Sequence, residues 1–90
     1  MEFSMSKAFV VAVFDSAMNA FAAPVFVASK GVAVRSFGDE VNRNAENNAL
    51  NRHPEDYALY VLAVFDEENG KFEENAPTLL VRGKDVIKSS

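Results

Sequence analysis

The sequence predicts an α+β protein with the element order ββαββ, in which two β-hairpins flank one helix and form a four-stranded antiparallel sheet. Two observations predict this fold. The tetrapeptide Ala-Val-Phe-Asp occurs at residues 12–15 and again at residues 63–66, each time at the end of a β-branched and aromatic run. Such runs favour strands that lead into turns. Between them lies one segment with helical periodicity. We expect the two tetrapeptide strands to lie at the centre of the sheet, related by an approximate twofold.

The first hairpin begins with the run FVVAVF at residues 9–14, which ends at the turn-forming pair Asp15-Ser16. Pro24 precedes the returning strand, VFVAS, where a proline suits a strand start or a sheet edge. In both copies of the tetrapeptide a Phe follows six residues after the Asp, as Phe21 and as Phe72. Core packing by Ala-Val-Phe and turn capping by Asp are sufficient to explain the repeat.

The helix is predicted over about Lys30–Asn42. Ser29 is a suitable N-cap, and apolar residues recur on one helical face at Ala33, Val34, Phe37 and Val41. The stretch that follows, NRNAENNALNRHPED at residues 42–56, is rich in Asn and has no sustained periodicity. We therefore expect a long loop there, which Leu50 anchors to the core.

The second hairpin begins with DYALYVLAVF at residues 56–65, the longest strand pattern in the chain. A loop, DEENGK, follows at residues 66–71, and its Asn69-Gly70 pair favours a hairpin turn. The returning strand is predicted as PTLLVR at residues 77–82.

Both faces of the long strand are apolar. Regular alternation places Leu59, Ala63 and Phe65 on one face and Tyr60 and Leu62 on the other. One helix covers one face of a sheet, so an apolar, partly aromatic face is left, which soluble monomers rarely expose. Two explanations stay open. A homo-oligomer, most simply a dimer, buries this face, which we favour because aliphatic residues outnumber the rings; alternatively, nucleobases stack on the rings.

The bulk composition narrows the classes of function. Ninety residues, 49% of them hydrophobic and 24% charged, predict a single globular domain over residues 1–90. Residues 1–6 are candidates for a disordered extension, and Met5 is an alternative start. Residues 84–90 are expected to form a tail. No apolar run reaches the length of a membrane span, so no membrane partner is expected.

Catalysis is not expected. The chain has no cysteine and one histidine, which excludes thiol nucleophiles, disulfides and zinc sites built on cysteine. His53 lies beside Glu55 and Asp56, and such a pair suits a general base, but no Ser stands in a recognisable nucleophile context. We expect no cofactor and no bound metal.

The net charge is −4 and the sequence pI is about 4.8, which disfavours general binding to phosphate backbones. The only local concentration of basic residues runs from Arg82 to Lys88. Lys30 and Arg35 join it if the second hairpin ends near the start of the helix. The candidate DNA contacts are Lys30, Arg35, Arg82 and Lys84, with Phe14 and Tyr60 as stacking partners. The alternative is a solvated face that balances nearby acids.

Several segments together resemble one family. They are FDS after an apolar strand, SKGVAVRSFGDEVN, HPEDYALYVLAVFDEENGKF and the returning strand. Their order is similar to that in the small nonstructural protein of microviruses, which are single-stranded DNA phages, and most similar to the gokushovirus kind. The resemblance covers about Val10 to Val81. It implies a phage protein made in the host bacterial cytoplasm, which binds DNA during genome replication or packaging, and it offers no catalytic motif. The Asn-rich insert, the N-terminal extension and the acidic balance depart from the family pattern.

The leading functional hypothesis is a non-enzymatic accessory protein of phage single-stranded DNA metabolism, which binds DNA as an oligomer. The alternative is a protein-interaction module that acts on phage replication proteins, capsid proteins or a host factor without touching DNA. Binding to short single strands separates the two, because phosphate contacts weaken steeply as salt rises.

Overall fold

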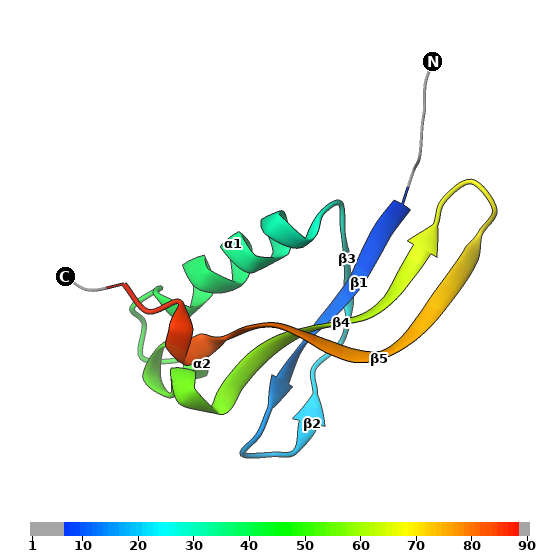
Figure 1. Ribbon diagram of the computed structural model, residues 1–90. Coiled ribbons are helices and arrows are strands. Elements are labelled where there is room, and N and C mark those ends of the chain that lie inside the picture. Colours follow the sequence, from blue (N-terminus) through cyan, green and yellow to red (C-terminus); the bar gives the residue numbers. More distant parts are fainter. Residues whose placement is uncertain (1–6, 89–90) are drawn as a thin grey trace.

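A computed structural model describes residues 7–88 and consists of one antiparallel sheet with a helix on one of its faces (Figure 1). The sheet has five strands, β1 (Lys7–Asp15), β2 (Ala20–Phe21), β3 (Val25–Val27), β4 (Tyr57–Asp66) and β5 (Lys71–Arg82). Their order is β2-β1-β4-β5, and β3 also pairs with β1. The α+β class and the antiparallel pairing are confirmed, and the two tetrapeptide strands, β1 and β4, are neighbours at the centre.

The prediction of four strands is wrong in one respect. The returning strand of the first hairpin is interrupted, so that β2 and β3 pair with successive parts of the β1 edge that β4 leaves open. The break falls at residues 22–24. Pro24 has no backbone N–H to donate to a sheet ladder, which explains why the edge strand stops before it and resumes after it.

The repeated tetrapeptide has the same structural role in both hairpins. Asp15 pairs with Ala20 and Asp66 with Lys71, so each turn contains four residues. In each, the Asp side chain accepts backbone N–H groups two and three residues ahead, at 2.9 and 3.3 Å in the first turn and 3.0 and 3.3 Å in the second. Each turn ends in a residue with positive φ, Asn19 at 55° and Gly70 at 68°. The predicted turn capping by Asp is confirmed.

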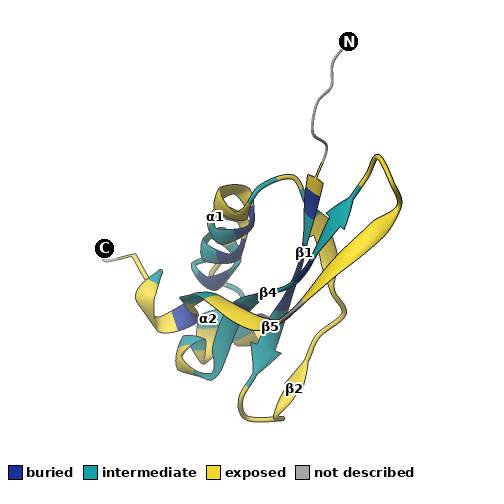
Figure 2. Ribbon diagram, turned by 45° about the vertical axis from the view of Figure 1, so that its right-hand side comes forward, coloured by how far each residue is buried: buried dark blue, intermediate teal, exposed yellow. Residues whose placement is uncertain are grey.

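Helix α1 (Lys30–Val41) matches the predicted helix to within one residue. The Ser29 side chain accepts the N–H of Val32 at 3.1 Å and caps the helix, as expected. Ala33, Phe37 and Val41 are buried against Val11, Leu59 and Val61 of the sheet. This contact forms the core, and burial is concentrated in β1, β4 and the sheet-facing side of α1 (Figure 2).

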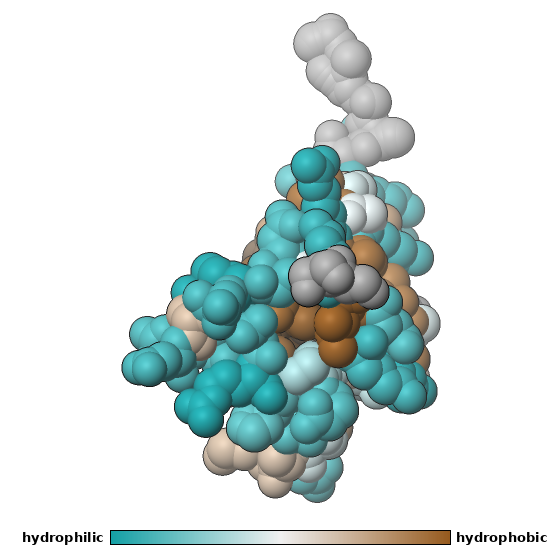
Figure 3. All heavy atoms as spheres, turned by 90° about the vertical axis from the view of Figure 1, so that its left-hand side faces the viewer, coloured by the Kyte–Doolittle hydropathy of each residue, from teal (hydrophilic) through white to brown (hydrophobic). Residues whose placement is uncertain are grey.

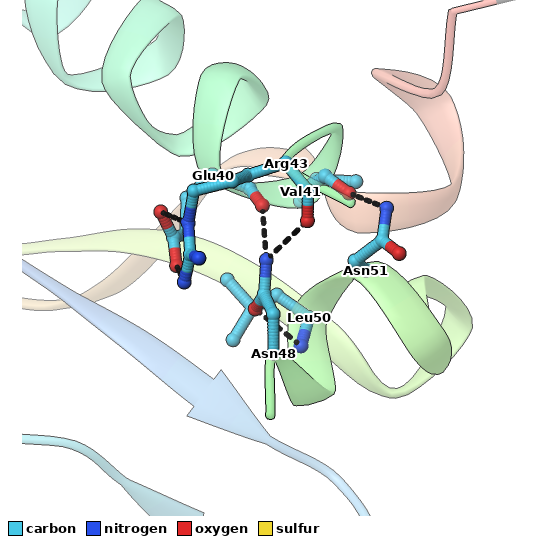
Figure 4. Close-up of polar contacts among 6 residues, drawn as sticks. All are labelled: Glu40, Val41, Arg43, Asn48, Leu50 and Asn51. Carbon is cyan, nitrogen blue, oxygen red and sulfur yellow. Dashed lines mark hydrogen bonds and ion pairs between the residues drawn. The ribbon is translucent and has the colours of Figure 1, made fainter. Parts of the chain in front are cut away.

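The Asn-rich segment is not a simple loop, and that prediction is wrong. It contains a short helix, α2 (Ala49–Arg52), and a 3₁₀ turn, η1 (Pro54–Asp56). Asn48, which is 3% exposed, donates to the carbonyl oxygens of Glu40 and Arg43, each at 2.8 Å, and accepts the N–H of Leu50 (Figure 4). Asn51 donates to the carbonyl of Val41 at 2.9 Å. These amides donate to carbonyls in and just after the last turn of the helix, where intrahelical donors run out, although the Glu40 carbonyl also accepts the N–H of Arg43 at 3.1 Å.

The segment after β5 also has a defined course. A second 3₁₀ turn, η2 (Gly83–Asp85), follows directly, and Val86 packs against the core. Asn42 donates to the carbonyl of Val86 at 2.8 Å and accepts the N–H of Lys88 at 2.9 Å. The end of the second hairpin is therefore held at the C-terminal end of α1. The expected extension at residues 1–6 lies outside the described residues.

The second hairpin differs from the prediction in the length of its returning strand. Strand β5 begins at Lys71, directly after the turn, and not at Pro77. Its register against β4 shifts twice.

Viewed from the side shown in Figure 3, the surface is mostly hydrophilic, and apolar atoms are exposed together in one central region. No helix among residues 7–88 is long and apolar enough to cross a membrane.

Candidate functional site

The sheet face opposite α1 carries an unusual number of aromatic side chains. Residues directly opposite in neighbouring strands project to the same face. Val11 and Val61 are paired and belong to the helix side, so the alternate β1 residues, Ala8, Val10, Ala12 and Phe14, project to the other side. We call this the helix-free face.

A β-bulge decides which β4 residues join the helix-free face. Val11 pairs with Val61, but its neighbour Val10 pairs with Ala63, so Leu62 is an extra residue in β4. Such an insertion reverses the alternation that follows it. Phe65 is paired with Ala8 and therefore lies on the same face as Tyr60. The prediction that Ala63 and Phe65 share a face with Leu59 is wrong for this reason.

The rings gather into two clusters. The pocket-side cluster consists of Phe14, Phe21 and Tyr60, with ring centroids 4.8–6.1 Å apart. The tip-side cluster, next to the turn of the second hairpin, consists of Phe26, Phe65 and Phe72, with centroids 4.8–6.2 Å apart. Pairing within each hairpin, Phe14 with Phe21 and Phe65 with Phe72, brings the rings together.

These rings cover the helix-free face and remain partly open to solvent. Ala8, Val10 and Ala12 project to this face and are nonetheless buried. The outer rings, which come from edge strands, are the exposed ones: Phe21 is 42%, Phe26 58% and Phe72 52% exposed. The expectation of an apolar, aromatic second face is thus confirmed. Its structural role is to shield the sheet, and its open ring surface is available for binding.

A pocket of about 370 Å³ opens beside the pocket-side cluster, and it gathers four of the six candidate DNA contacts. Phe14 and Tyr60 supply its aromatic side, and Arg82 and Lys84 supply its cations. Arg82 is paired with Ala58 at the end of β5. The first turn borders the pocket, and the backbone N–H and hydroxyl of Ser16 donate to the Asp56 carbonyl at 2.8 and 2.9 Å.

The pocket also contains acids. Glu55 and Asp56 line it beside Tyr57. The pKa of Tyr57 is raised, first by burial and then by the negative charges of Asp15 and Asp56, so its hydroxyl stays protonated at neutral pH. The pocket therefore presents rings, two cations and two carboxylates, a mixed surface that a polar and aromatic ligand fits better than a simple polyanion.

Lys30 and Arg35 lie elsewhere. The Lys30 Nζ stands 5.4 Å from the centre of the Phe9 ring, and Phe9 pairs with Val64, near the far end of β4 from Ala58. Arg35 is exposed on α1. The second hairpin ends near the C-terminal end of α1 and not near its start, so the structure does not bring these two residues to Arg82 and Lys84.

The arrangement of His53 offers little chemistry. In the described part of the chain, His53, Glu55 and Asp56 form the only group of three or more potential ligand residues within 4.8 Å of one another. The His53 Nδ1 lies 4.0 Å from Glu55 Oε2, and both side chains are more than half exposed. An exposed set of this kind is common without an ion.

Sequence reasoning missed the outer rings Phe21, Phe26 and Phe72, and also Phe65 of the central strand β4, as site residues. The equal spacing of Phe21 and Phe72 from the two turn aspartates was a usable signal for two cross-strand pairs. Phe26 and Phe65 needed the register of β3 and the bulge in β4, neither of which the sequence pattern reveals.

Comparison with known proteins gives one match. No curated protein and no solved structure is similar enough to this chain to count as a match. The model of one protein family, described as "Phage ORF5 protein", matches residues 8–86, which include both helices, the pocket and every strand except the first residue of β1. The chain therefore belongs to the Phage ORF5 protein family.

Proposed function

We propose that this phage protein is a non-enzymatic accessory of single-stranded DNA replication or packaging, which binds single-stranded DNA as an oligomer in the host bacterial cytoplasm. One observation carries the DNA part: Phe14, Tyr60, Arg82 and Lys84 line one pocket on the edge of the aromatic face. Proteins that bind single strands combine cations along the backbone with rings on which bases stack. The resemblance to microvirus nonstructural proteins supports the same role.

The net charge of −4 limits how much affinity phosphate contacts provide. Stacking therefore matters more here than in a basic protein, and each stacked base contributes about 1–3 kcal/mol. An oligomer offsets the charge further, because pockets from two subunits can hold one strand. Sequence preference is expected to be weak, since phosphate contacts and stacking read little of the base edges.

The proposal is tested by titrating short single strands at several salt concentrations. If Arg82 and Lys84 are the phosphate contacts of one subunit, log K falls with log salt at a slope of about −1.4, from about −0.7 per phosphate. Affinity should then drop roughly sevenfold between about 50 and about 200 mM salt. Absence of binding at low salt overturns the DNA part of the proposal.

A pair of charge-matched variants locates the contact. Arg82→Glu with Lys84→Glu should abolish binding, whereas Lys30→Glu with Arg35→Glu makes the same change in net charge away from the pocket. We expect the second double variant to bind within about threefold of the parent, since long-range effects of exposed charges are screened. Equal losses in both variants would refute the assignment of the pocket.

A second candidate is a protein-interaction module that acts on phage or host proteins without DNA contact. The two carboxylates that line the pocket, Glu55 and Asp56, favour it, because they repel phosphate and can pair with a basic partner. In that case neither the parent protein nor Arg82→Glu with Lys84→Glu binds DNA in the titrations. A basic peptide then binds the parent protein, and more tightly as the salt concentration is lowered.

A further inference from the structure

We propose that Asn69 is a site of spontaneous deamidation in this protein, and that the Asp66 side chain slows the reaction in the folded turn. The inference goes beyond the proposed function and does not depend on it, because it concerns neither DNA nor the association of copies. It assigns a covalent modification to the tip of the second hairpin.

The first argument is the residue that follows Asn69. Among the asparagines of this chain, Asn69 is the only one followed by glycine. Deamidation begins when the backbone nitrogen of the next residue attacks the side-chain carbonyl carbon of the Asn, and a side chain on that next residue hinders the approach. Glycine has no Cβ and the widest choice of backbone angles. Asn69 therefore faces the least hindered nucleophile of any asparagine in the sequence.

The reaction needs only water. The Gly70 nitrogen forms a bond to Asn69 Cγ, the bond between Cγ and Nδ2 breaks, and Nδ2 leaves as ammonia together with the proton that Gly70 gives up. Water then opens the cyclic imide at either carbonyl, which yields aspartate or isoaspartate. Residues 67–70 are exposed, and their turn projects from the sheet away from α1 (Figure 1). Water therefore reaches the site.

The second argument is that the folded turn restrains both reacting groups. The Gly70 N–H donates to the Asp66 carbonyl oxygen at 2.8 Å, so the nucleophile keeps its proton. The leaving group, Asn69 Nδ2, donates to Asp66 Oδ2 at 2.8 Å. Hydrogen bonds to a carboxylate are stronger than those between neutral groups. Both bonds must open before the ring can close, so the folded turn should react more slowly than the unfolded chain.

The turn of the first hairpin provides an internal reference. Asp15 accepts two backbone N–H groups there, as Asp66 does in the second turn. The asparagine of the first turn, Asn19, is followed by Ala20. The first turn thus has the same cap without an Asn-Gly pair, and Asn19 should stay unmodified.

The modification changes the second turn. Aspartate at position 69 places a second carboxylate where the amide now donates to Asp66, and the like charges repel each other. Isoaspartate also lengthens the main chain by one carbon atom, inside a turn whose ends, Asp66 and Lys71, are paired. Phe65 and Phe72 form the next pair, with ring centroids 4.8 Å apart. The modified chain should therefore unfold at a lower temperature than the parent.

Timed incubation of the full chain at mildly alkaline pH tests the proposal, with peptide mass spectrometry and enzymatic labelling of isoaspartate as readouts. Position 69 should be modified before any other asparagine, and more slowly in the folded parent than in urea. Asp66→Ala should speed the modification about three- to tenfold, which is the effect of losing a hydrogen bond that otherwise has to open first. The matched control is Asp15→Ala, which removes the same cap from the other turn and should leave the rate at Asn69 within about 1.5-fold of the parent.

Asp66→Asn separates the side-chain bond from the turn itself, and it replaces Asp66→Ala if that variant unfolds. It keeps an oxygen that accepts the N–H groups of Glu68 and Asn69, but it turns an NH₂ group toward the Asn69 amide in place of an acceptor. It should still speed the modification, and circular dichroism verifies the fold of each variant. The proposal is overturned if the folded parent reacts as fast as the chain in urea, if neither Asp66 variant reacts faster than the parent, or if Asp15→Ala speeds the reaction at Asn69 equally.

Discussion

Asn48 offers the sharpest test of how the Asn-rich segment stabilises the fold. Its side chain is buried, donates to two carbonyls at the end of α1 and accepts the N–H of Leu50. Replacement by Ala removes three hydrogen bonds, so the Arg43 carbonyl and the Leu50 N–H lose this partner, whereas the Glu40 carbonyl keeps the N–H of Arg43 at 3.1 Å. A hydrogen bond contributes about 0.5–1.5 kcal/mol and an N-cap about 0.5–2 kcal/mol. We therefore expect Asn48→Ala to cost about 2–4 kcal/mol.

This loss is large beside the total stability of a chain of this size, roughly 5–13 kcal/mol. Urea unfolding followed by far-ultraviolet circular dichroism measures it as a lower midpoint with an unchanged m-value. Asn47→Ala, at an exposed neighbouring position, is the matched control and should change stability by less than about 0.5 kcal/mol. Asn48→Asp keeps the acceptor for the Leu50 N–H but places a carboxylate against two carbonyls, so it should be no more stable than Asn48→Ala.

The reasoning is refuted if Asn48→Ala costs no more than Asn47→Ala. It is also refuted if Asn48→Asp restores the parent stability, because the amide donor would then be unimportant. A small effect of Asn48→Ala would mean that water satisfies the helix carbonyls in place of this side chain.

Two further predictions concern turns and backbone contacts. A Cβ on Gly83 would lie 2.3 Å from the carbonyl oxygen of Pro54, so Gly83→Ala should destabilise the protein by about 1–3 kcal/mol. Gly31 has open space around it, so Gly31→Ala should stabilise the protein by up to about 1 kcal/mol. Thermal unfolding measures both changes. The pKa of Asp66 is held below its ordinary value, first by the hydrogen bond from the Asn69 side chain. The stability that this bond contributes is therefore present above the unfolded pKa of about 4 and is lost as the pH falls through the folded pKa. In an NMR titration Asn69→Ala should raise the pKa of Asp66, and an unchanged pKa would count against the assigned cause.

The sequence by itself determined the local elements. Ser29 begins the helix, the two Asp residues shape the turns, and Pro24 precedes the start of the edge strand β3. Each acts on backbone groups a few residues away, and this is why a linear pattern is enough to locate them. The two paired tetrapeptide strands follow as well, because both are apolar on two faces and belong at the centre of a sheet.

Only the tertiary structure decided how these elements make a site. The extra residue Leu62 in β4 arises from fitting β4 to β1, and it turns Phe65 toward Tyr60's side of the sheet. Asn48 became a core residue because the segment folds back onto the open end of α1. Arg82 and Phe14 line one pocket because both are paired with Ala58 of β4. Register, bulges and long-range caps depend on contacts between distant residues, whose energies no local pattern encodes.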